Sequence, residues 1–440
     1  MDERFENEFD IDSDIKLIKE VNKGSSVSNI AFHSRWPILA NGSYSDFQDR
    51  SVQFFNVPKL EKVGSIEWGA QKVNCVAFHP RLNAMLTGDS NDKNNVKLWY
   101  VTAHPSDNDN YKFSAIELMT LGGHTNVITC IAFHSKQPFF ATGSWDKQVK
   151  IWHYNENDWH ATNCILTINL NSNVTSIAFH PTQHIIATAS RGSGAKMFDF
   201  SDAAAATGID TTRIIEHDIT LGEHIDTTCV AFHPGPINFI LAVGGHANDV
   251  ETGRTIYSIK LWDYSSIDNP ICVATLTEHR QKINSMIFHP LIPLLVSGSD
   301  DGTVNFWCIE DDITKTKCYY TIQYSLYGIN IVTSIAICPH NNSLLATGTF
   351  NGMLRLYNIS ELMSKLTKRN PFYIKPCNPD THIFCREFRG NGKTPQIKRG
   401  GGNNKNRNTK RNRHKLSRKR NSRTFRKKRK SHNRRYVSST

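Results

Sequence analysis

Short apolar runs of four to eight residues recur along most of the chain, and each run is bounded by Gly, Asn, Asp or Pro. The runs are rich in Val, Ile, Phe and Thr, and no window sustains the 3.6-residue period of an amphipathic helix. Such segments are typical of β-strands that follow one another in a meander. The pattern therefore predicts an all-β fold built from many short antiparallel strands.

The strand pattern is also a repeat, marked by the triplet Ala-Phe-His. The central position of the triplet recurs seven times, as Phe32, Phe78, Phe133, Phe179, Phe232, Phe288 and Ile337. A Gly or another small residue follows about ten positions later, and a strand then ends in an aromatic residue, namely Phe55, Trp99, Trp152, Phe198, Trp262, Trp307 or Tyr357. Four short strands in a unit of about 45 to 55 residues are typical of a β-propeller blade, so the repeats predict seven blades.

The unit at residues 123–152 carries the resemblance to a known family. Its sequence, GHTNVITCIAFHSKQPFFATGSWDKQVKIW, resembles a WD repeat, and the resemblance extends over residues 15–358. In that family a His, a Ser or Thr, an Asp and a Trp form a hydrogen-bonded chain within a blade. The matching residues are His124, Thr142, Asp146 and Trp152 in the third repeat and His279, Ser297, Asp301 and Trp307 in the sixth. The resemblance implies a seven-bladed β-propeller of four-stranded antiparallel blades.

The repeats divide the chain into four parts. Residues 15–21 alternate like a strand ahead of the first triplet, and in the family such a segment supplies the outer strand of the last blade. We expect this pairing because an open propeller would leave exposed sheet edges. The parts are then an acidic arm at 1–14, the propeller at 15–360, a linker with a short helix at 361–390 and a tail rich in Lys and Arg at 391–440.

One face of the predicted propeller carries the candidate binding residues. In family members the residue before the network Asp often lies on the face where the turns between the second and third strands emerge, and it contacts partners. The matching residues here are Tyr44, Trp145, Arg191, His246, Asp300 and Phe350. Aromatic and Arg side chains are typical of binding hot spots, so this face is the expected site for a protein partner. The longer turn at residues 246–258 should project from the same face.

Catalytic and metal-binding chemistry is not expected. Most of the His residues occupy the repeated triplet, where a structural role at a strand end is the simplest interpretation. The Asp residues of the GSWD and GSDD turns have no paired base, and the chain has neither a GxxxxGK[ST] nor a GxSxG motif. Cys377, His382 and Cys385 provide three possible zinc ligands, but a structural zinc site needs four. The expectation is a protein that is not an enzyme and that has no cofactor.

Charge divides the chain into two regions. The formal net charge is +12, and residues 391–440 contain twenty Lys or Arg and no Asp or Glu. Residues 1–390 therefore carry a formal charge of −8, the difference between +12 and +20. A tail with few apolar residues and charges of one sign cannot build a core, and we expect it to be disordered.

The tail is expected to bind a polyanion. Clustered cations displace counterions from a phosphate backbone, which gives binding to RNA or DNA without sequence specificity. The residues that would carry this binding are Arg411, Arg413, Lys415, Arg418, Lys419, Arg420, Arg426, Lys427, Lys428, Arg429 and Lys430. The segment RKKRK also matches a nuclear-import patch, and an anionic membrane surface is less favoured because no lipidation motif accompanies the charges.

These observations favour a non-catalytic scaffold that holds protein partners on the propeller and nucleic acid on the tail. The expected state is a monomeric propeller within a larger complex. Two alternatives use the same fold: a substrate-recruiting adaptor of a ubiquitin ligase, or a propeller of the vesicle-coat type. The first alternative predicts an Arg shortly after the terminal Trp-Asp pair of a blade, which the segments WHYN, WDYS and WCIE lack.

The Cys residues are scattered and form no CxxC pair, which indicates a reducing compartment. An intracellular location in the nucleus, the nucleolus or the cytoplasm is therefore expected. The acidic N-terminus lacks the apolar core of a secretory signal, and no apolar run is long enough to span a membrane. The Asn- and Lys-rich composition also resembles that of proteins from giant DNA viruses, which would imply a virion or a viral factory.

Overall fold

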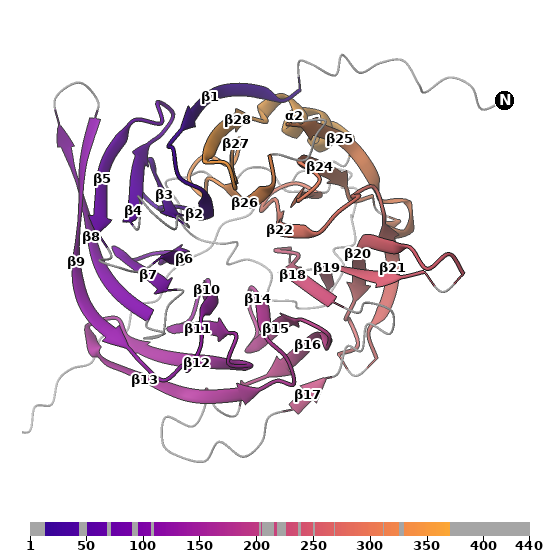
Figure 1. Ribbon diagram of the computed structural model, residues 1–440, viewed down its shortest axis with the longest axis horizontal. Helices are drawn as coiled ribbons and strands as arrows, with labels where there is room; N and C mark the ends of the chain where they lie inside the picture. The colour runs from indigo at the N-terminus through magenta and orange to yellow at the C-terminus, as the bar shows by residue number, and fades with distance from the viewer. Residues whose placement is uncertain are drawn as a thin grey trace, which may run out of the picture. The chain divides into compact units, whose positions relative to one another are not determined.

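The computed structural model describes residues 14–43, 51–67, 72–89, 96–106, 110–201, 204, 215–217, 226–235, 239–249, 251–267, 269–310, 312–324 and 330–369. Seven four-stranded antiparallel sheets occupy these ranges and stand around a common centre as the blades of a propeller (Figure 1). The seven-bladed, nearly all-β fold that the repeats predict is confirmed.

In the first four blades the strands follow one another from the centre outwards. The first blade contains β2 (Val27–Phe32), β3 (Ile38–Ser43), β4 (Ser51–Asn56) and β5 (Lys62–Glu67). The second contains β6 (Val73–Phe78), β7 (Ala84–Asp89), β8 (Val96–Ser106) and β9 (Asn110–Leu121). The third contains β10 (Ile128–Phe133), β11 (Phe139–Ser144), β12 (Gln148–Asn155) and β13 (Asp158–Asn169). The fourth contains β14 (Val174–Phe179), β15 (Ile185–Ser190), β16 (Gly194–Asp199) and β17 (Ile215–His217).

The last three blades repeat this order. The fifth contains β18 (Asp226–Phe232), β19 (Ile240–Asn248), β20 (Thr255–Asp263) and β21 (Ile271–Leu276). The sixth contains β22 (Ile283–Phe288), β23 (Leu294–Ser299), β24 (Thr303–Cys308) and, after the short 3-10 helix η1 (Ile313–Lys315), β25 (Lys317–Gln323). The seventh contains β26 (Val332–Ile337), β27 (Leu344–Thr349), β28 (Met353–Asn358) and, as its outer strand, β1 (Lys16–Asn22).

The seventh blade combines both ends of the propeller. Strand β1 pairs antiparallel with β28, from Lys16 opposite Asn358 to Asn22 opposite Met353. The closure expected from residues 15–21 is therefore confirmed. The pairing covers the edge of β28 and joins the first blade to the last through the chain itself.

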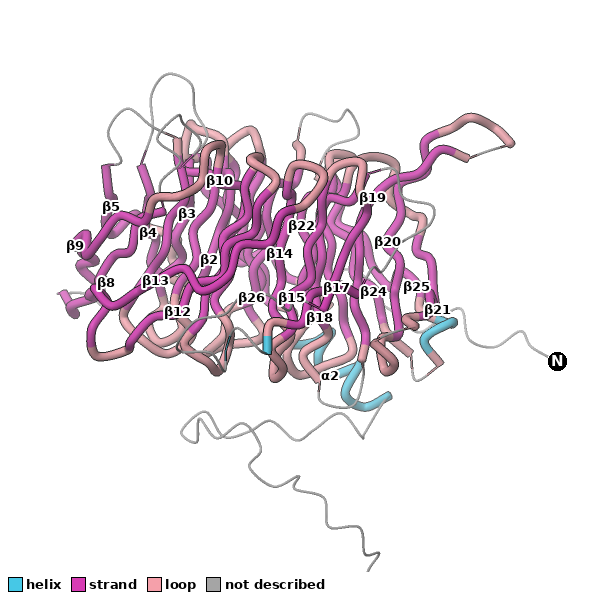
Figure 2. The backbone as a smooth tube through the Cα atoms, turned by 90° about the horizontal axis from the view of Figure 1, so that it is seen from below, coloured by secondary structure: helices cyan, strands magenta, loops and turns pink. Residues whose placement is uncertain are grey.

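Helix α2 (Ser360–Arg369) follows β28 and packs on the propeller. Its Leu362 and Leu366 are buried in the same apolar cluster as Ile15, next to the start of β1. The Lys365 ammonium lies 2.7 Å from a carboxylate oxygen of the buried Asp14. The helix therefore stabilises the start of β1, where the ring is closed. Figure 2 shows the helix on the opposite face from the projecting β19–β20 hairpin.

Neighbouring blades meet through one contact that recurs around the centre. A fully buried β-branched residue lies at the start of each innermost strand, and these residues are Val27, Val73, Ile128, Val174, Thr227, Ile283 and Val332. In most joints this side chain lies against a Gly on the second strand of the preceding blade. A Cβ added to Gly298 would be 2.5 Å from a methyl carbon of Val332, and one added to Gly143 would be 2.7 Å from Val174. The periodic Gly of the sequence is thus required by close approach of the next blade.

The joint between the fourth and fifth blades is built differently. Ala189 takes the place of the Gly, because it stands opposite Ser176 as Gly143 stands opposite Cys130. The facing residue is Thr227, whose hydroxyl donates to the Gly194 carbonyl at 2.8 Å and accepts from the Ser190 N–H at 3.0 Å. Hydrogen bonds therefore replace the close apolar contact in this joint.

Side-chain hydrogen bonds reinforce the same joints. The residue after the β-branched position carries a hydroxyl or amide that donates to the carbonyl of the β-branched residue in the next blade, at 2.6 to 3.0 Å. These donors are Ser28, Asn74, Thr129, Thr175, Thr228 and Asn284. The last joint uses Ser334, whose hydroxyl accepts from the Ile30 N–H at 3.1 Å. All seven joints are thus linked by polar as well as apolar contacts near the centre.

The third and sixth blades contain a buried hydrogen-bonded chain. In the third, the Trp152 N–H donates to the Thr142 hydroxyl at 3.1 Å, and His124 bridges that hydroxyl at 2.8 Å and Asp146 at 2.8 Å. In the sixth, Trp307, Ser297, His279 and Asp301 repeat the chain at 2.7 to 3.0 Å. Burial would raise the pKa of Asp301, but hydrogen bonds from His279, Thr303 and a backbone N–H outweigh it and lower the pKa to about 2.

Other blades have different residues at some positions of this hydrogen-bonded network. In the second, the Trp99 N–H still donates to Thr87 at 2.8 Å. In the fifth, Val243 occupies the hydroxyl position, and the buried N–H of Trp262 has no hydrogen-bond partner within the described part of the chain. In the seventh, the Tyr357 hydroxyl bonds to that of Tyr324, which bonds in turn to Thr347. Individual blades therefore tolerate different internal networks.

The His of the repeated triplet closes the turn after the innermost strand. Its Nδ1 accepts hydrogen bonds from backbone N–H groups two or three residues further on in His33, His79, His134, His180, His233 and His289. An imidazole that accepts at Nδ1 carries its proton on Nε2 and is neutral. Burial lowers the pKa of these groups, to about 3 in His33 and His79 and to about 4 in His180, His233 and His289.

Because the pKa values of these His residues are lowered by burial, we expect the protein to lose stability in mild acid. In the unfolded chain an imidazole titrates near pH 6.5, whereas the buried imidazoles titrate at about 3 to 4. Within this window the unfolded chain binds more protons, so the free energy of unfolding falls as the pH drops from about 6.5 to about 4. Above the window these groups add no pH dependence. Thermal melts between about pH 7.5 and pH 4.5 should therefore show a steep fall in Tm.

A matched pair of variants isolates this effect. In His289→Asn the Asn Oδ1 can accept the same backbone N–H groups without titrating, so the fall in Tm should be shallower. Substitution of the exposed His160 by Asn should leave the pH profile unchanged. A Tm that does not depend on pH in this range, or the same slope in all three proteins, would contradict the explanation.

Candidate functional site

The candidate binding face is formed by the turns between the second and third strands. Trp145, Arg191, Asp300 and Phe350 occupy equivalent places there, because the backbone N–H of each donates at 2.8 to 3.0 Å to the residue just before the innermost strand of its own blade. His246 stands in the same place but within a longer strand, where it pairs with Asp226. Tyr44 lies outside the described residues.

Trp145 is a partly exposed aromatic side chain on this face. It is 39% exposed, unlike Trp152 of the same blade, which is buried. The Arg191 guanidinium carbon lies 5.9 Å from the centre of the Trp145 ring, which is within the range of a cation–π contact. The two residues come from the third and fourth blades. Together they form a composite surface of an aromatic ring and a cation across a blade boundary.

Phe350 and Asp300 differ in how accessible they are. The Phe350 side chain is 51% exposed at the turn of the seventh blade. The Asp300 carboxylate instead accepts a hydrogen bond at 2.6 Å from the Asn284 amide, which also donates to the Val332 carbonyl of the next blade. Asp300 is therefore tied to the joint between the sixth and seventh blades, whereas Phe350 presents an apolar surface.

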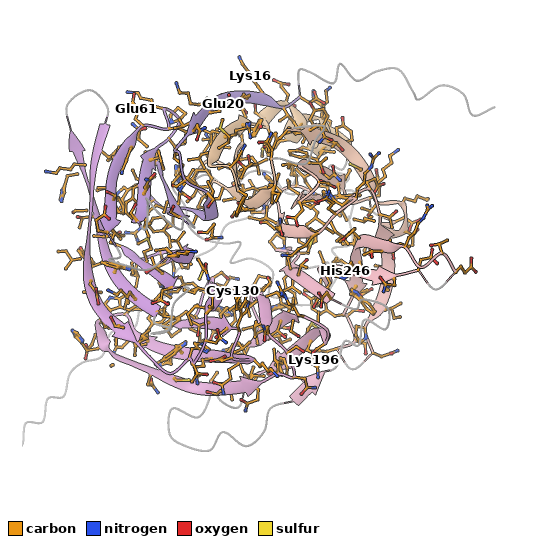
Figure 3. The ribbon with its side chains drawn as sticks, in the orientation of Figure 1. Lys16, Glu20, Glu61, Cys130, Lys196 and His246 are labelled. Atoms are coloured by element: carbon orange, nitrogen blue, oxygen red, sulfur yellow. The ribbon has the colours of Figure 1, made fainter. Side chains whose placement is uncertain are left out.

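The fifth blade extends this face with a hairpin. Strands β19 and β20 continue past His246 as far as the pair Asn248 and Thr255. Figure 2 shows the hairpin rising above the other turns, and Figure 3 labels His246 near its base. The His246 ring lies 5.5 Å from that of Tyr257, and the Ile256 side chain is exposed. The sequence indicated the projecting segment, but not that Ile256 and Tyr257 would supply its side chains.

Several buried titratable groups of the blades have a structural role. The triplet His residues close turns, and the buried chain residues His124 and Asp146 satisfy each other. Burial raises the pKa of the thiols that line the joints, to about 12 in Cys130 and about 11 in Cys229, so both stay protonated and unreactive. Figure 3 places Cys130 beside the centre of the ring.

Metal-binding clusters and membrane-spanning helices are both absent from the described ranges. These ranges contain no group of three or more His, Cys, Asp or Glu side chains able to hold a metal ion. None of their helices is long and apolar enough to cross a membrane. Cys377, His382 and Cys385 lie outside the described residues, as do residues 1–13 of the predicted arm at 1–14, the rest of the linker from 370 and the tail at 391–440.

Comparison with family models identifies the repeats. The model described as WD domain, G-beta repeat, matches residues 116–153, 162–199, 270–308 and 318–358. Each match begins in, or one residue before, the outer strand of one blade and ends within the third strand of the next. The matches thus include the inner three strands of the third, fourth, sixth and seventh blades.

Curated relatives share the repeats at low identity. The nuclear distribution protein nudF of Aspergillus flavus is 26% identical over 290 residues, which are 55% of this chain and 59% of that protein. Pre-mRNA-processing factor 19 of Oryza sativa subsp. japonica is 28% identical over 246 residues, 56% of this chain and 40% of that protein. The target of rapamycin complex subunit wat1 of Schizosaccharomyces pombe is 25% identical over 198 residues, 45% of this chain and 56% of that protein.

The chain spans between 40% and 59% of the length of these relatives. The family model matches four of the repeats within this chain. With seven four-stranded blades and the Trp, Ser or Thr, His and Asp chain in two of them, the protein is a WD40-repeat protein.

Proposed function

We propose that the protein is a non-catalytic scaffold that binds a protein partner on the face carrying Trp145. The observation that carries this proposal is the exposed Trp145 ring with the Arg191 guanidinium over it. Trp and Arg are the residues most enriched in binding hot spots, and a large aromatic side chain gains most when a partner removes it from water. A Trp that served only its own blade would be buried, as Trp152 is.

The surrounding surface suits a protein partner better than a small ligand. Phe350 adds an exposed ring at the seventh blade, and the fifth blade adds the hairpin with Ile256. These groups are spread over turns of separate blades, as in an extended protein interface with an aromatic core and a polar rim. The name of wat1 describes that relative as a subunit of a complex, which supports the same role for this chain.

The proposal predicts that Trp145→Ala weakens partner binding without harming the fold. Loss of a hot-spot aromatic side chain typically weakens binding by more than about 2 kcal/mol, which is roughly thirtyfold. The same change should lower the free energy of unfolding by less than about 1 kcal/mol, because the ring is partly exposed. Trp152→Ala should cost about 3 to 5 kcal/mol, since it removes a buried ring and its hydrogen bond. Thermal melts and quantitative capture of the partner from cell extract measure the two effects.

Tyr100→Ala provides the matched control. Tyr100 is an aromatic residue of similar exposure, 42%, but it lies on β8 of the second blade, away from the turns of this face. Its substitution should leave capture of the partner unchanged. Equal loss of binding in Trp145→Ala and Tyr100→Ala would show that the partner does not bind specifically to the face carrying Trp145. Equal loss of stability in Trp145→Ala and Trp152→Ala would show that Trp145 supports the core.

We further propose that the tail at 391–440 binds RNA or DNA through its phosphates. The support is the charge distribution: twenty Lys or Arg without one acidic residue, attached to a chain whose other residues sum to −8. A short segment with this charge density releases many counterions when it meets a polyanion. Arg426, Lys427, Lys428, Arg429 and Lys430 form its densest cluster. Partners on the propeller and nucleic acid on the tail would be held by one chain.

Deletion of residues 391–440 tests the tail. The shortened protein should keep its Tm, because the deleted segment cannot contribute a core, and it should lose nucleic-acid binding. Binding by the full chain should fall steeply with salt and depend little on base sequence. Fluorescence anisotropy across a salt series measures both. Undiminished binding by the shortened protein would transfer the site to the propeller, and a shallow salt slope or a strong sequence preference would refute phosphate binding by the tail.

A further inference from the structure

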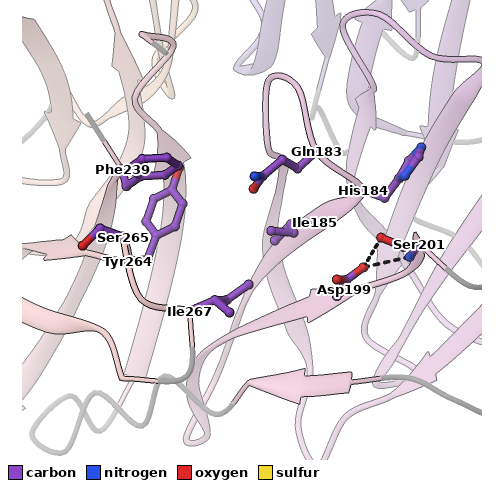
Figure 4. Close-up of a pocket in the computed structure, with 9 residues that line it drawn as sticks. All are labelled: Gln183, His184, Ile185, Asp199, Ser201, Phe239, Tyr264, Ser265 and Ile267. Atoms are coloured by element: carbon purple, nitrogen blue, oxygen red, sulfur yellow. Dashed lines mark hydrogen bonds between the residues drawn. The ribbon is translucent and has the colours of Figure 1, made fainter. Parts of the chain in front are cut away.

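A pocket of about 480 Å³ opens between the fourth and fifth blades. Its walls come from the β14–β15 turn, the end of β16, the start of β19 and the end of β20 (Figure 4). In an antiparallel blade these connections lie on one face, and the turns between the second and third strands lie on the other. The pocket is therefore on the face opposite to Trp145, and it is separate from the proposed partner surface.

One wall of the pocket is apolar. Phe239 is 37% exposed, and its ring meets that of Tyr264 edge to face with the centres 5.7 Å apart. Ile267 continues this wall, and Ile185, which pairs with Asp199 in the fourth blade, lies across the opening (Figure 4). An exposed aromatic ring beside aliphatic side chains offers a surface for an apolar side chain or for the flat face of a guanidinium.

The opposite wall carries a single negative charge. Asp199 is the only carboxylate among the nine lining residues, and none of them is Lys or Arg. One of its oxygens, Oδ1, accepts from the N–H of Ser201 at 2.8 Å and from its hydroxyl at 2.5 Å. Figure 4 shows the second oxygen turned toward the pocket. The pocket thus combines a fixed carboxylate with an aromatic and aliphatic wall.

We propose that this pocket binds a peptide segment of a partner protein through an arginine side chain next to an apolar residue. The guanidinium pairs with the carboxylate of Asp199 and lies against the ring of Phe239, while the neighbouring apolar side chain covers Ile267. Arginine fits better than lysine because its planar group can bond to a carboxylate and stack on an aromatic ring at the same time. The complementarity of one anion and one apolar wall selects a cationic, apolar segment and rejects an acidic one.

Comparison with the seventh blade suggests a variant that removes the charge of Asp199 and keeps the turn that Asp199 forms with Ser201. In the seventh blade Asn358 accepts from the Ser360 N–H at 2.8 Å, as Asp199 does from Ser201. Asp199→Asn should therefore preserve the local structure. In the fifth blade Asp263 makes the same bond to Ser265 at 2.8 Å but does not line the pocket. Asp263→Asn is thus a matched control that removes one charge from the neighbouring turn.

The test is a titration of the full-length protein, labelled with ¹³C at isoleucine methyl groups, with the peptide acetyl-Leu-Arg-amide. The signals of Ile185 and Ile267 should shift and saturate. Acetyl-Leu-citrulline-amide has nearly the same shape without the charge, and it should bind at least about tenfold more weakly, as expected when a charge-assisted hydrogen bond is lost. Asp199→Asn should reduce binding of the arginine peptide to the same extent, and Asp263→Asn should keep it within about twofold.

Several outcomes would overturn the proposal. Equal affinity for the arginine and citrulline peptides would show that charge does not select the ligand. Undiminished binding in Asp199→Asn, with an unchanged Tm, would place the peptide elsewhere. Shifts that do not saturate by about 10 mM peptide would mean that the pocket is no specific site, because such affinities are below those of recognition pockets.

Discussion

A ring of sheets has least space at its centre, where every blade must approach two neighbours closely. In this protein a β-branched side chain from one blade lies against the second strand of the blade before it. In most joints a Gly on that strand provides the space, because it has no side chain. Polar side chains beside the contact then bond to the carbonyl of the same β-branched residue. The apolar and polar contacts thus act at one point in each joint. The differing internal networks of the blades are tolerated because these joints hold the ring together.

The sequence was sufficient for the parts of the fold that repeat. The spacing of Gly, aromatic and triplet residues predicted seven blades, and the alternation at residues 15–21 predicted the closing strand. Contacts between residues without a fixed spacing could not be predicted. Tyr324 reaches Thr347 from the loop after β25, and Thr227 bonds to the fourth blade in the joint where Ala189 replaces the Gly. Such substitutions compensate one another in space, and a single sequence does not reveal which residues will meet.

The candidate site was predictable to a similar degree. The position before the network Asp placed Trp145, Arg191 and Phe350 on one face, but the contact between Trp145 and Arg191 depends on the angle between two blades. The pocket beside Asp199 had no signal in the sequence, because its walls come from four separate connections. The two faces offer different chemistry: an aromatic and cationic surface on one, and a pocket with a carboxylate and an apolar wall on the other. The two proposals together predict that one partner on each face can be bound at the same time.

The central claim is that the close approach of blades at Gly positions stabilises the ring, and the unfolding free energy of Gly298→Ala tests it most directly. A Cβ at Gly298 would meet Val332 at 2.5 Å and Ile335 at 3.0 Å, whereas one at Gly122 would meet nothing within 4 Å. Denaturant unfolding should show a loss of about 1 to 3 kcal/mol for Gly298→Ala, as for other overpacked cores. Gly122→Ala should be neutral or stabilising by up to about 1 kcal/mol. Equal unfolding free energies for the two variants would contradict the claim.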